Sequence, residues 1–162
     1  MHPVLILQLT ILLALANGAP LVAARLLGRR FACPLDGRLI FVDGRPLLGA
    51  SKTVRGMLAA VAVSTAGALL VGMPGSVGAV VGAGAMAGDA LSSFIKRRFA
   101  LPPSSRATGL DQIPESLVPL LASRLMLPLT PWDIAASVAI FLVGEIVLSR
   151  ALYRVHLRDR PY

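Results

Sequence analysis

The stretch SVGAVVGAGAMAGDALSSFIKRR (76–98) is uncharged until Asp89, and it closes on three consecutive basic residues. A run of this length and composition predicts a membrane-spanning helix. Its first half carries Gly78 and Gly82 in the GxxxG spacing, which lets a second helix approach closely. An acid at membrane depth is costly unless it is paired, hydrated or bound to a metal, so Asp89 is the first candidate functional residue.

One stripe of this predicted helix changes from small to polar side chains toward its basic end. Two interpretations of Asp89 are open. In one, Asp89 forms a salt bridge with Lys96 that merely closes the helix end; in the other, it belongs to a binding site. The stripe consists of Gly78, Gly82, Ala85, Asp89, Ser92, Ser93 and Lys96.

The whole chain has the composition of an all-α integral membrane protein. Of its 162 residues, 56% are hydrophobic and 15% are charged, and the mean hydropathy is +0.75. A soluble domain carries more charge. The single cysteine, Cys33, excludes an intrachain disulfide and a thiolate metal cluster. The net charge of +8 fits anionic lipid or a phosphate-rich substrate, and so apolar a chain disfavours nucleic acid as a partner.

Five apolar runs predict one transmembrane domain (1–162) with its N-terminus outside and its C-terminus in the cytoplasm. Basic residues gather in the predicted loops 28–53 and 96–113 and in the C-terminal tail. Five spans place these three segments on one side, which the positive-inside rule makes cytoplasmic, whereas four spans would divide them. The predicted spans are 4–27, 54–73, 76–95, 114–130 and 132–155.

The first predicted loop, CPLDGRLIFVDGRPLLGASKTVRG (33–56), repeats the triplet Asp-Gly-Arg. Asp-Gly favours turns, so the repeat predicts a hairpin, and we assign Arg38 to one of its turns. Four later residues precede the second span, where we expect them to face a polyphosphate, because Lys supplies a point charge and Arg a planar fork. The alternative is an ordinary basic flank of a span. The four are Arg45, Lys52, Thr53 and Arg55.

The second predicted loop, KRRFALPPSSRATGLDQIPE (96–115), returns to the membrane at Asp111. Asp89 and Asp111 therefore approach the same face from adjacent spans. Two convergent carboxylates with bases around them suit a Mg²⁺ ion that bridges phosphate oxygens. Glu145 and Asn17 lie within predicted spans, where we interpret them as interhelical contacts, with substrate contact as the lesser alternative.

Together these motifs resemble the CDP-archaeol synthase family, membrane enzymes that move a cytidylyl group from CTP onto an isoprenoid glycerol-ether phosphate. The similar elements extend over almost the whole chain. The segment 93–97 also resembles the SxxKR element of CTP:phosphatidate cytidylyltransferases. The elements are ANGAP (16–20), DGRLIFVDGRPLLGASKTVRG (36–56), GDALSSFIKRR (88–98), LDQIP (110–114) and ALYRVHLRDRPY (151–162).

The resemblance implies a multi-pass protein of the cell membrane whose active site faces the cytoplasm. There, a Mg²⁺-dependent reaction of CTP with a membrane lipid phosphate would give CDP-lipid and pyrophosphate for phospholipid biosynthesis. It implies Asp89 and Asp111 as metal-linked catalytic acids and Lys96 as a catalytic, phosphate-holding lysine. The expected substrate-binding residues are Arg45, Lys52, Thr53, Arg55, Ser93, Arg97 and Asn17.

The chain departs from the family pattern in one place. Members usually carry a second acid in a DQxD element, and here Pro114 takes that position, followed by Glu115. The acceptor lipid therefore stays open between ether isoprenoid and ester acyl types. We expect the lipid to enter through a groove between the third and fourth spans.

Three other functions fit the sequence less well than a transferase of this kind. A small ion or solute carrier would use the intramembrane acids Asp89 and Glu145, but no comparable polar trail crosses the outer half of the spans. A phosphatidyl-alcohol transferase would need several aspartates on two successive helices, which this chain lacks. A structural membrane subunit would not need such elaborate loop motifs.

Overall fold

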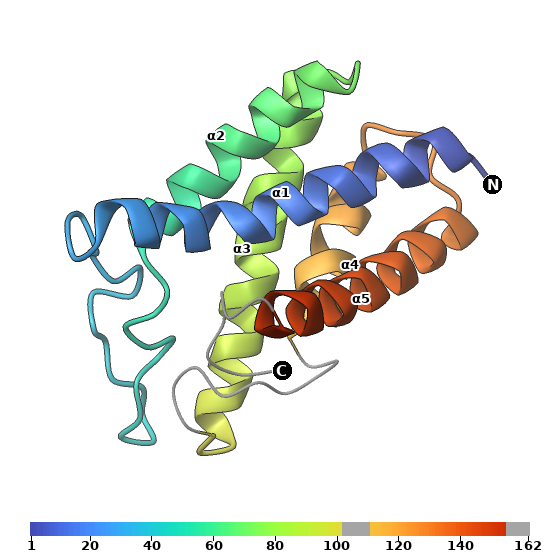
Figure 1. Ribbon diagram of the computed structural model, residues 1–162. Helices are drawn as coiled ribbons and strands as arrows, with labels where there is room; N and C mark the ends of the chain where they lie inside the picture. The colour runs from blue at the N-terminus through green and yellow to red at the C-terminus, as the bar shows by residue number, and fades with distance from the viewer. Residues whose placement is uncertain (102–110, 155–162) are drawn as a thin grey trace.

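The computed structural model describes residues 1–101 and 111–154, with side chains up to residue 147, and within these ranges the chain is all-α. Its helices follow the predicted apolar runs (Figure 1). Arg106 and the last part of the closing element (155–162) fall outside the described residues. The helices are α1 (Pro3–Leu27), α2 (Val54–Leu70), α3 (Gly75–Arg98), α4 (Gln112–Ser123) and α5 (Pro131–Arg154).

The helices alternate in direction between two ends of the molecule (Figure 1). The N-terminus, the α2–α3 turn and the α4–α5 connection lie toward the upper right of that view. The loop 28–53 and the C-terminus of α3 lie at the lower left. The described basic residues of the first loop and of the α3 terminus therefore share one end, as an alternating arrangement of helices requires. By length and composition, α1 and α3 are able to cross a membrane.

Helix α3 lies at the centre, and its first half packs against α2 through glycines. A Cβ atom on Gly82 would lie 2.8 Å from the Cα of Val61, and one on Gly78 would collide with the carbonyl oxygen of Ser64. Only glycine permits this approach of two backbones. The predicted GxxxG contact is confirmed, and its partner is α2.

The opposite edge of α3 packs just as closely against α4. A Cβ atom on Gly84 would lie 2.6 Å from the Cα of Pro119, and one on Gly88 would collide with the carbonyl oxygen of Pro114. The groove expected between the third and fourth spans is therefore closed at these levels. At these two levels the prediction is wrong, because the sequence shows that small residues permit close packing but not which neighbour uses them.

Helix α4 is shorter than its predicted span, which covered 114–130. It has 12 residues and ends at Ser123, so it measures about 18 Å, less than the ~30 Å of a hydrocarbon core. Near the start of α5, the buried Asp133 accepts hydrogen bonds from the backbone N–H of Thr130 (3.0 Å) and of His2 (2.7 Å). Hydropathy did not predict the early end of α4, because the turn and irregular chain at 124–130 have the same apolar composition as a span.

An apolar core joins α1 to the other helices. It is built by interlocking aliphatic side chains, with one aromatic ring from α5. Its buried members include Leu9, Leu12, Leu13, Val77, Val81, Leu120, Ile134 and Phe141.

The first loop is a folded structure with the two turns that the sequence predicts. The Asp36 carboxylate accepts a hydrogen bond from the backbone N–H of Arg38 (3.0 Å), and Asp43 accepts one from the N–H of Arg45 (3.1 Å). Such Asx turns are what Asp-Gly sequences favour. The hairpin interpretation is confirmed for both Asp-Gly-Arg triplets.

Asp36 also holds the second half of this loop through hydrogen bonds. Its carboxylate accepts the backbone N–H groups of Leu48 (2.9 Å) and Gly49 (3.1 Å). Burial by itself raises the pKa of this carboxyl, but the backbone N–H donors outweigh burial and hold the pKa below its ordinary value. Asp36 therefore stays ionised and keeps the two turns together at neutral pH.

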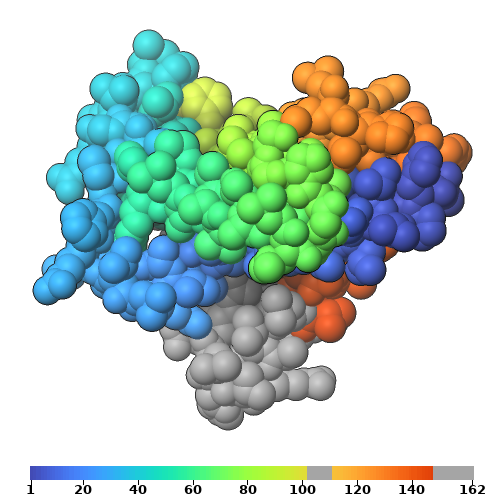
Figure 2. Space-filling view, turned by 90° about the horizontal axis from the view of Figure 1, so that it is seen from above, coloured from blue at the N-terminus to red at the C-terminus, as the bar shows by residue number. Residues whose placement is uncertain are grey.

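The hairpin is fastened to the end of α3. Arg45 donates through Nη1 to the carbonyl oxygens of Arg97 (3.3 Å) and Arg98 (2.6 Å), which close that helix. In return, Arg98 donates to the Asp43 carboxylate (2.6 Å), and its guanidinium lies 4.5 Å from the centre of the Phe41 ring. Viewed from above, the loop in cyan and α4 in orange border a hollow with α3 in yellow-green behind them (Figure 2).

Candidate active site

The polar end of α3 forms a charged seam with the start of α4. The two helices run antiparallel, and their contacts keep one register from Gly88 against Pro114 to Lys96 against Asp111. The Lys96 Nζ atom lies 2.7 Å from Asp111 Oδ1, and both side chains are largely buried. Asp89 lies between these two levels on α3. The structure therefore brings all three predicted catalytic residues to one seam.

The partner of Asp89 comes from the first loop. Lys52 Nζ lies 2.5 Å from each carboxylate oxygen of Asp89, and about one fifth of each side chain is exposed, 19% for Lys52 and 21% for Asp89. The interpretation in which Asp89 pairs with Lys96 is wrong, because Lys96 reaches Asp111 instead. Helical spacing favoured the local pair, and it carries no information about a lysine 37 residues away.

A third acid, Glu115, reaches this seam and was not among the predicted site residues. It follows Asp111 by one turn of α4 and makes a side-chain hydrogen bond with Asp89. Glu145 on α5 is close enough to Glu115 to interact electrostatically with it. The available signal was the position of Glu115 directly after Pro114, next to the place where the family's second acid was expected.

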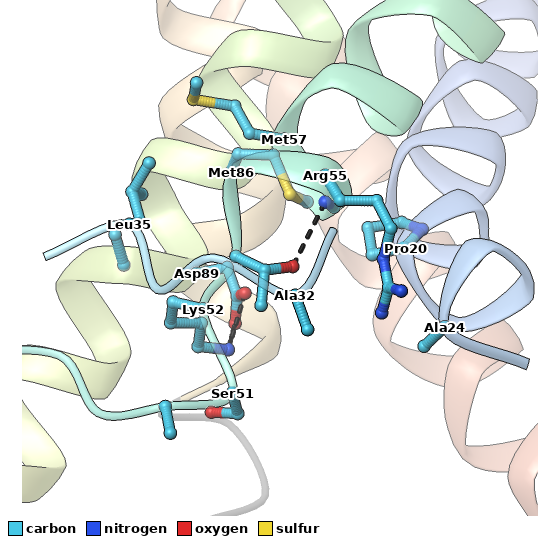
Figure 3. Close-up of a pocket in the computed structure, with 14 residues that line it drawn as sticks. Pro20, Ala24, Ala32, Leu35, Ser51, Lys52, Arg55, Met57, Met86 and Asp89 are labelled. Carbon is cyan, nitrogen blue, oxygen red and sulfur yellow. Dashed lines mark hydrogen bonds and ion pairs between the residues drawn. The ribbon is translucent and has the colours of Figure 1, made fainter. Parts of the chain in front are cut away.

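A cavity of about 340 Å³ opens beside the Lys52–Asp89 pair (Figure 3). Pro20 and Ala24 of α1 border it on one side, and Met57 and Met86 border it on another. Of the described residues, the lining includes the predicted substrate ligands Lys52, Thr53 and Arg55 and the acid Asp89, whereas Lys96 and Asp111 lie outside that lining. The cavity is large enough for a phosphate group, with cations and an acid on its wall.

Several predicted substrate ligands also hold the backbone in place. Thr53 is the N-cap of α2 and accepts the N–H of Gly56 (3.2 Å). Arg55 donates to the carbonyl oxygens of Gly28 (3.0 Å) and Arg30 (2.6 Å), beyond the end of α1. Asn17 donates within α1, to the Leu13 carbonyl (2.9 Å).

The remaining predicted ligands lie on the last turns of α3. Ser93 and Arg97 are both buried there, with 3% and 8% of their surfaces exposed. The neighbouring Ser92 donates to the carbonyl oxygen of Asp89 (3.0 Å), so this part of the helix is polar inside as well as at its surface. Arg45, by contrast, is not among the residues that line the cavity, and it donates to the last carbonyl oxygens of α3.

The acids of the seam supply some, but not all, of the ligands of a hard divalent cation. Among the described residues, no three His, Cys, Asp or Glu side chains surround one point in the manner of a complete metal site. Mg²⁺ needs less than this, because it is usually held by one or two carboxylates together with water and substrate phosphates. The Asp89 and Glu115 carboxyl groups, in mutual contact, supply such a pair of oxygen ligands.

Relatives of this chain are enzymes of archaeal lipid synthesis. The family model described as CarS-like, CDP-archaeol synthase, matches residues 75–162. The CDP-archaeol synthase of Sulfurisphaera tokodaii is 36% identical over 80% of this chain and 81% of its own length. The CDP-archaeol synthase of Aeropyrum pernix is 32% identical over 91% of this chain and 86% of its own length.

A solved structure is also similar over most of this chain. It is described as structural insight into an intramembrane enzyme for archaeal membrane lipids biosynthesis. The two folds superpose with a TM-score of 0.77 and 29% sequence identity, covering 87% of this chain and 90% of the other. With more than half of its length matched by the family model, this chain belongs to the CDP-archaeol synthase family.

Proposed function

We propose that this membrane protein transfers the cytidylyl group of CTP to a lipid phosphate, giving CDP-lipid and pyrophosphate. Family membership supports this reaction. The location of its active site is supported by the pairing of Lys52 with Asp89 and of Lys96 with Asp111 at one end of α3. By family, the acceptor is an archaeol-type glycerol-ether phosphate. The carrier hypothesis has no comparable support.

The reaction is a displacement at phosphorus. An oxygen of the lipid phosphate attacks the α-phosphorus of CTP, the bond from this phosphorus to the bridging oxygen breaks, and pyrophosphate leaves with the electron pair. The nucleophile is already an anion, so the chain needs no dedicated general base. The obstacle is repulsion between two anionic reactants, and catalysis consists of positioning and charge neutralisation.

The paired lysines are the groups that bind the reacting phosphates. Lys52 lies on the cavity wall and exchanges Asp89 for a phosphate oxygen when substrate enters. Lys96 and Arg97, on the last turns of α3, bind the neighbouring phosphates. Ser93 lies on the same helix, after Asp89 and before Lys96. Each lysine is held in place by an acid until substrate arrives.

The acids have a second task in this proposal. Asp89, with Glu115 in contact and Asp111 one turn away along α4, would hold Mg²⁺. When bound, the ion supplies further neutralisation of phosphate charge. The loop 28–53 and the end of α3 would face the cytoplasm, because the described basic residues gather there.

In the test, purified protein is incubated with Mg²⁺, CTP labelled at the α-phosphate, and each of a panel of ether and ester lipid phosphates. We expect labelled CDP-lipid, and we expect Asp89→Asn to lower its formation by about a hundredfold or more, because the replacement removes the charge that holds Lys52 and the metal. Asp43→Asn is the matched control, since Asp43 is also a salt-bridged acid at this end of the molecule but lies on the hairpin.

Two results would contradict different parts of the proposal. Absence of CDP-lipid with every acceptor, from folded wild-type protein, would exclude the reaction. Wild-type rates in Asp89→Asn would leave the reaction in place and remove the seam from it.

A further inference from the structure

We infer that a groove between α1 and α2 binds a hydrocarbon chain of the lipid phosphate and so delivers its phosphate to Lys52; this inference rests on the proposed function. The groove has a volume of about 390 Å³ and is lined by apolar residues alone. On α1 it extends from Ala14 to Leu26, about 18 Å along the helix axis. On α2 it is lined by Ala59 and Val63.

Groove and polar cavity adjoin each other on the same two helices: they lie at the same level of α1 on neighbouring faces, and on α2 the groove residues follow the cavity residues. On α1, Ala19 and Ala23 line the groove, and the next residues, Pro20 and Ala24, line the cavity. On α2, Ala59 lines the groove one turn after Arg55, which lines the cavity. A lipid whose phosphate lies beside Lys52 and Arg55 would therefore have the apolar groove within reach of its chains.

The polar cavity and the apolar groove match the phosphate and the hydrocarbon chain of such a ligand. The cavity wall carries the cations Lys52 and Arg55, which suit a phosphate, and the groove offers only carbon surface, which suits a chain. The α3–α4 seam offers no equivalent passage at Gly84 and Gly88, where backbone contacts close it. The ligand expected in the groove is thus one hydrocarbon chain of the acceptor lipid.

Gly18 gives the means to test this. It lies in the groove, and a Cβ atom there would meet nothing within 4 Å. A leucine at this position begins from this open space, places its side chain in the groove and favours the helix more than glycine does. Gly144 on α5 is the matched control, because it is also a helical glycine with open space around it.

The experiment compares Gly18→Leu, Gly144→Leu and wild-type protein on a long-chain isoprenoid glycerol-ether phosphate and on a short-chain analogue of it. We expect Gly18→Leu to raise the KM for the long-chain acceptor about tenfold, which corresponds to about 1.4 kcal/mol of lost binding. The KM for CTP and the kinetics with the short-chain acceptor should stay unchanged, and Gly144→Leu should match wild type throughout.

A second measurement needs no variant. A long-chain lipid phosphate with a photoreactive group near its chain end is crosslinked to wild-type protein, with and without excess unlabelled lipid phosphate. We expect competed crosslinks within 14–26 and 59–63, mapped by mass spectrometry.

Competed crosslinks confined to α4 or α5 would overturn the inference. So would a Gly18→Leu protein that matches wild type on the long-chain acceptor, or one that loses the same factor on both acceptors. Wild-type protein that forms no CDP-lipid from any acceptor would instead contradict the proposed reaction, so the two failures are distinguishable.

Discussion

At the scale of single residues, the site depends on which charges meet, and Glu115 is the residue whose contact the sequence concealed. Its carboxyl group touches that of Asp89, beside Lys52. Two acids in contact repel each other unless a proton or a cation lies between them. A divalent ion shared by both would remove that repulsion, which gives Glu115 a definite expected role.

We therefore expect Glu115→Gln to raise the Mg²⁺ concentration needed for half-maximal activity by about tenfold or more, because one of the carboxylate ligands loses its charge. The measurement is a Mg²⁺ titration of CDP-lipid formation, together with the Mg²⁺-dependent shift in thermal unfolding of the protein without CTP. Glu145→Gln, the same replacement on α5, should change both titrations much less. An unaltered Mg²⁺ requirement in Glu115→Gln would assign this acid a structural role.

At the scale of helices, α3 acts as a spacer whose two glycine edges set the distance to α2 and to α4. The edge toward α4 is the more important for function, because the register that places Gly88 against Pro114 also places Lys96 against Asp111. A methyl group at Gly88 would meet backbone rather than a flexible side chain, so α4 itself has to move.

Gly88→Ala should thus lower the free energy of unfolding by about 1–3 kcal/mol and reduce CDP-lipid formation more than that loss of stability explains. Gly144→Ala should leave both unchanged or slightly improve stability, since its Cβ has open space. Thermal unfolding in detergent and the transferase assay check the two effects. Full activity in Gly88→Ala would show that the seam tolerates a wider spacing.

The comparison of sequence with structure is clearest at this scale. Apolar runs predicted five helices because hydropathy along the chain is a local property, and the Asp-Gly turns were predicted for the same reason. The end of α4 at Ser123, the partners of Asp89 and Lys96, and the closed α3–α4 seam were not predicted. Each of these depends on which segments meet in space, and a single sequence does not record that.

At the scale of the whole molecule, the two ends differ in chemistry. One end carries the hairpin, the basic terminus of α3 and the paired lysines, and the other carries the N-terminus and the α2–α3 turn (Figure 1). The only cysteine of the chain, Cys33, is exposed at the first of these ends. It serves as a natural probe of which end faces the cytoplasm.

A membrane-impermeant maleimide should label Cys33 in inverted vesicles or permeabilised cells and leave it unlabelled in intact cells. A protein in which Cys33 is replaced by Ala and Ser76, exposed at the start of α3, by Cys should show the opposite pattern. Labelling of Cys33 from outside intact cells would reverse the proposed orientation and place the lysines on the wrong side for cytoplasmic CTP.

The fastening of the hairpin also limits how substrates gain access to the cavity. The backbone of Lys52 is tied on both sides, since its carbonyl accepts the N–H of Leu35 (2.7 Å) and its own N–H donates to Gly49 (3.2 Å). With its main chain anchored, this lysine changes partners by rotating its four-carbon stem. The same lysine is therefore able to release Asp89 and take up a phosphate while the loop that carries it stays folded.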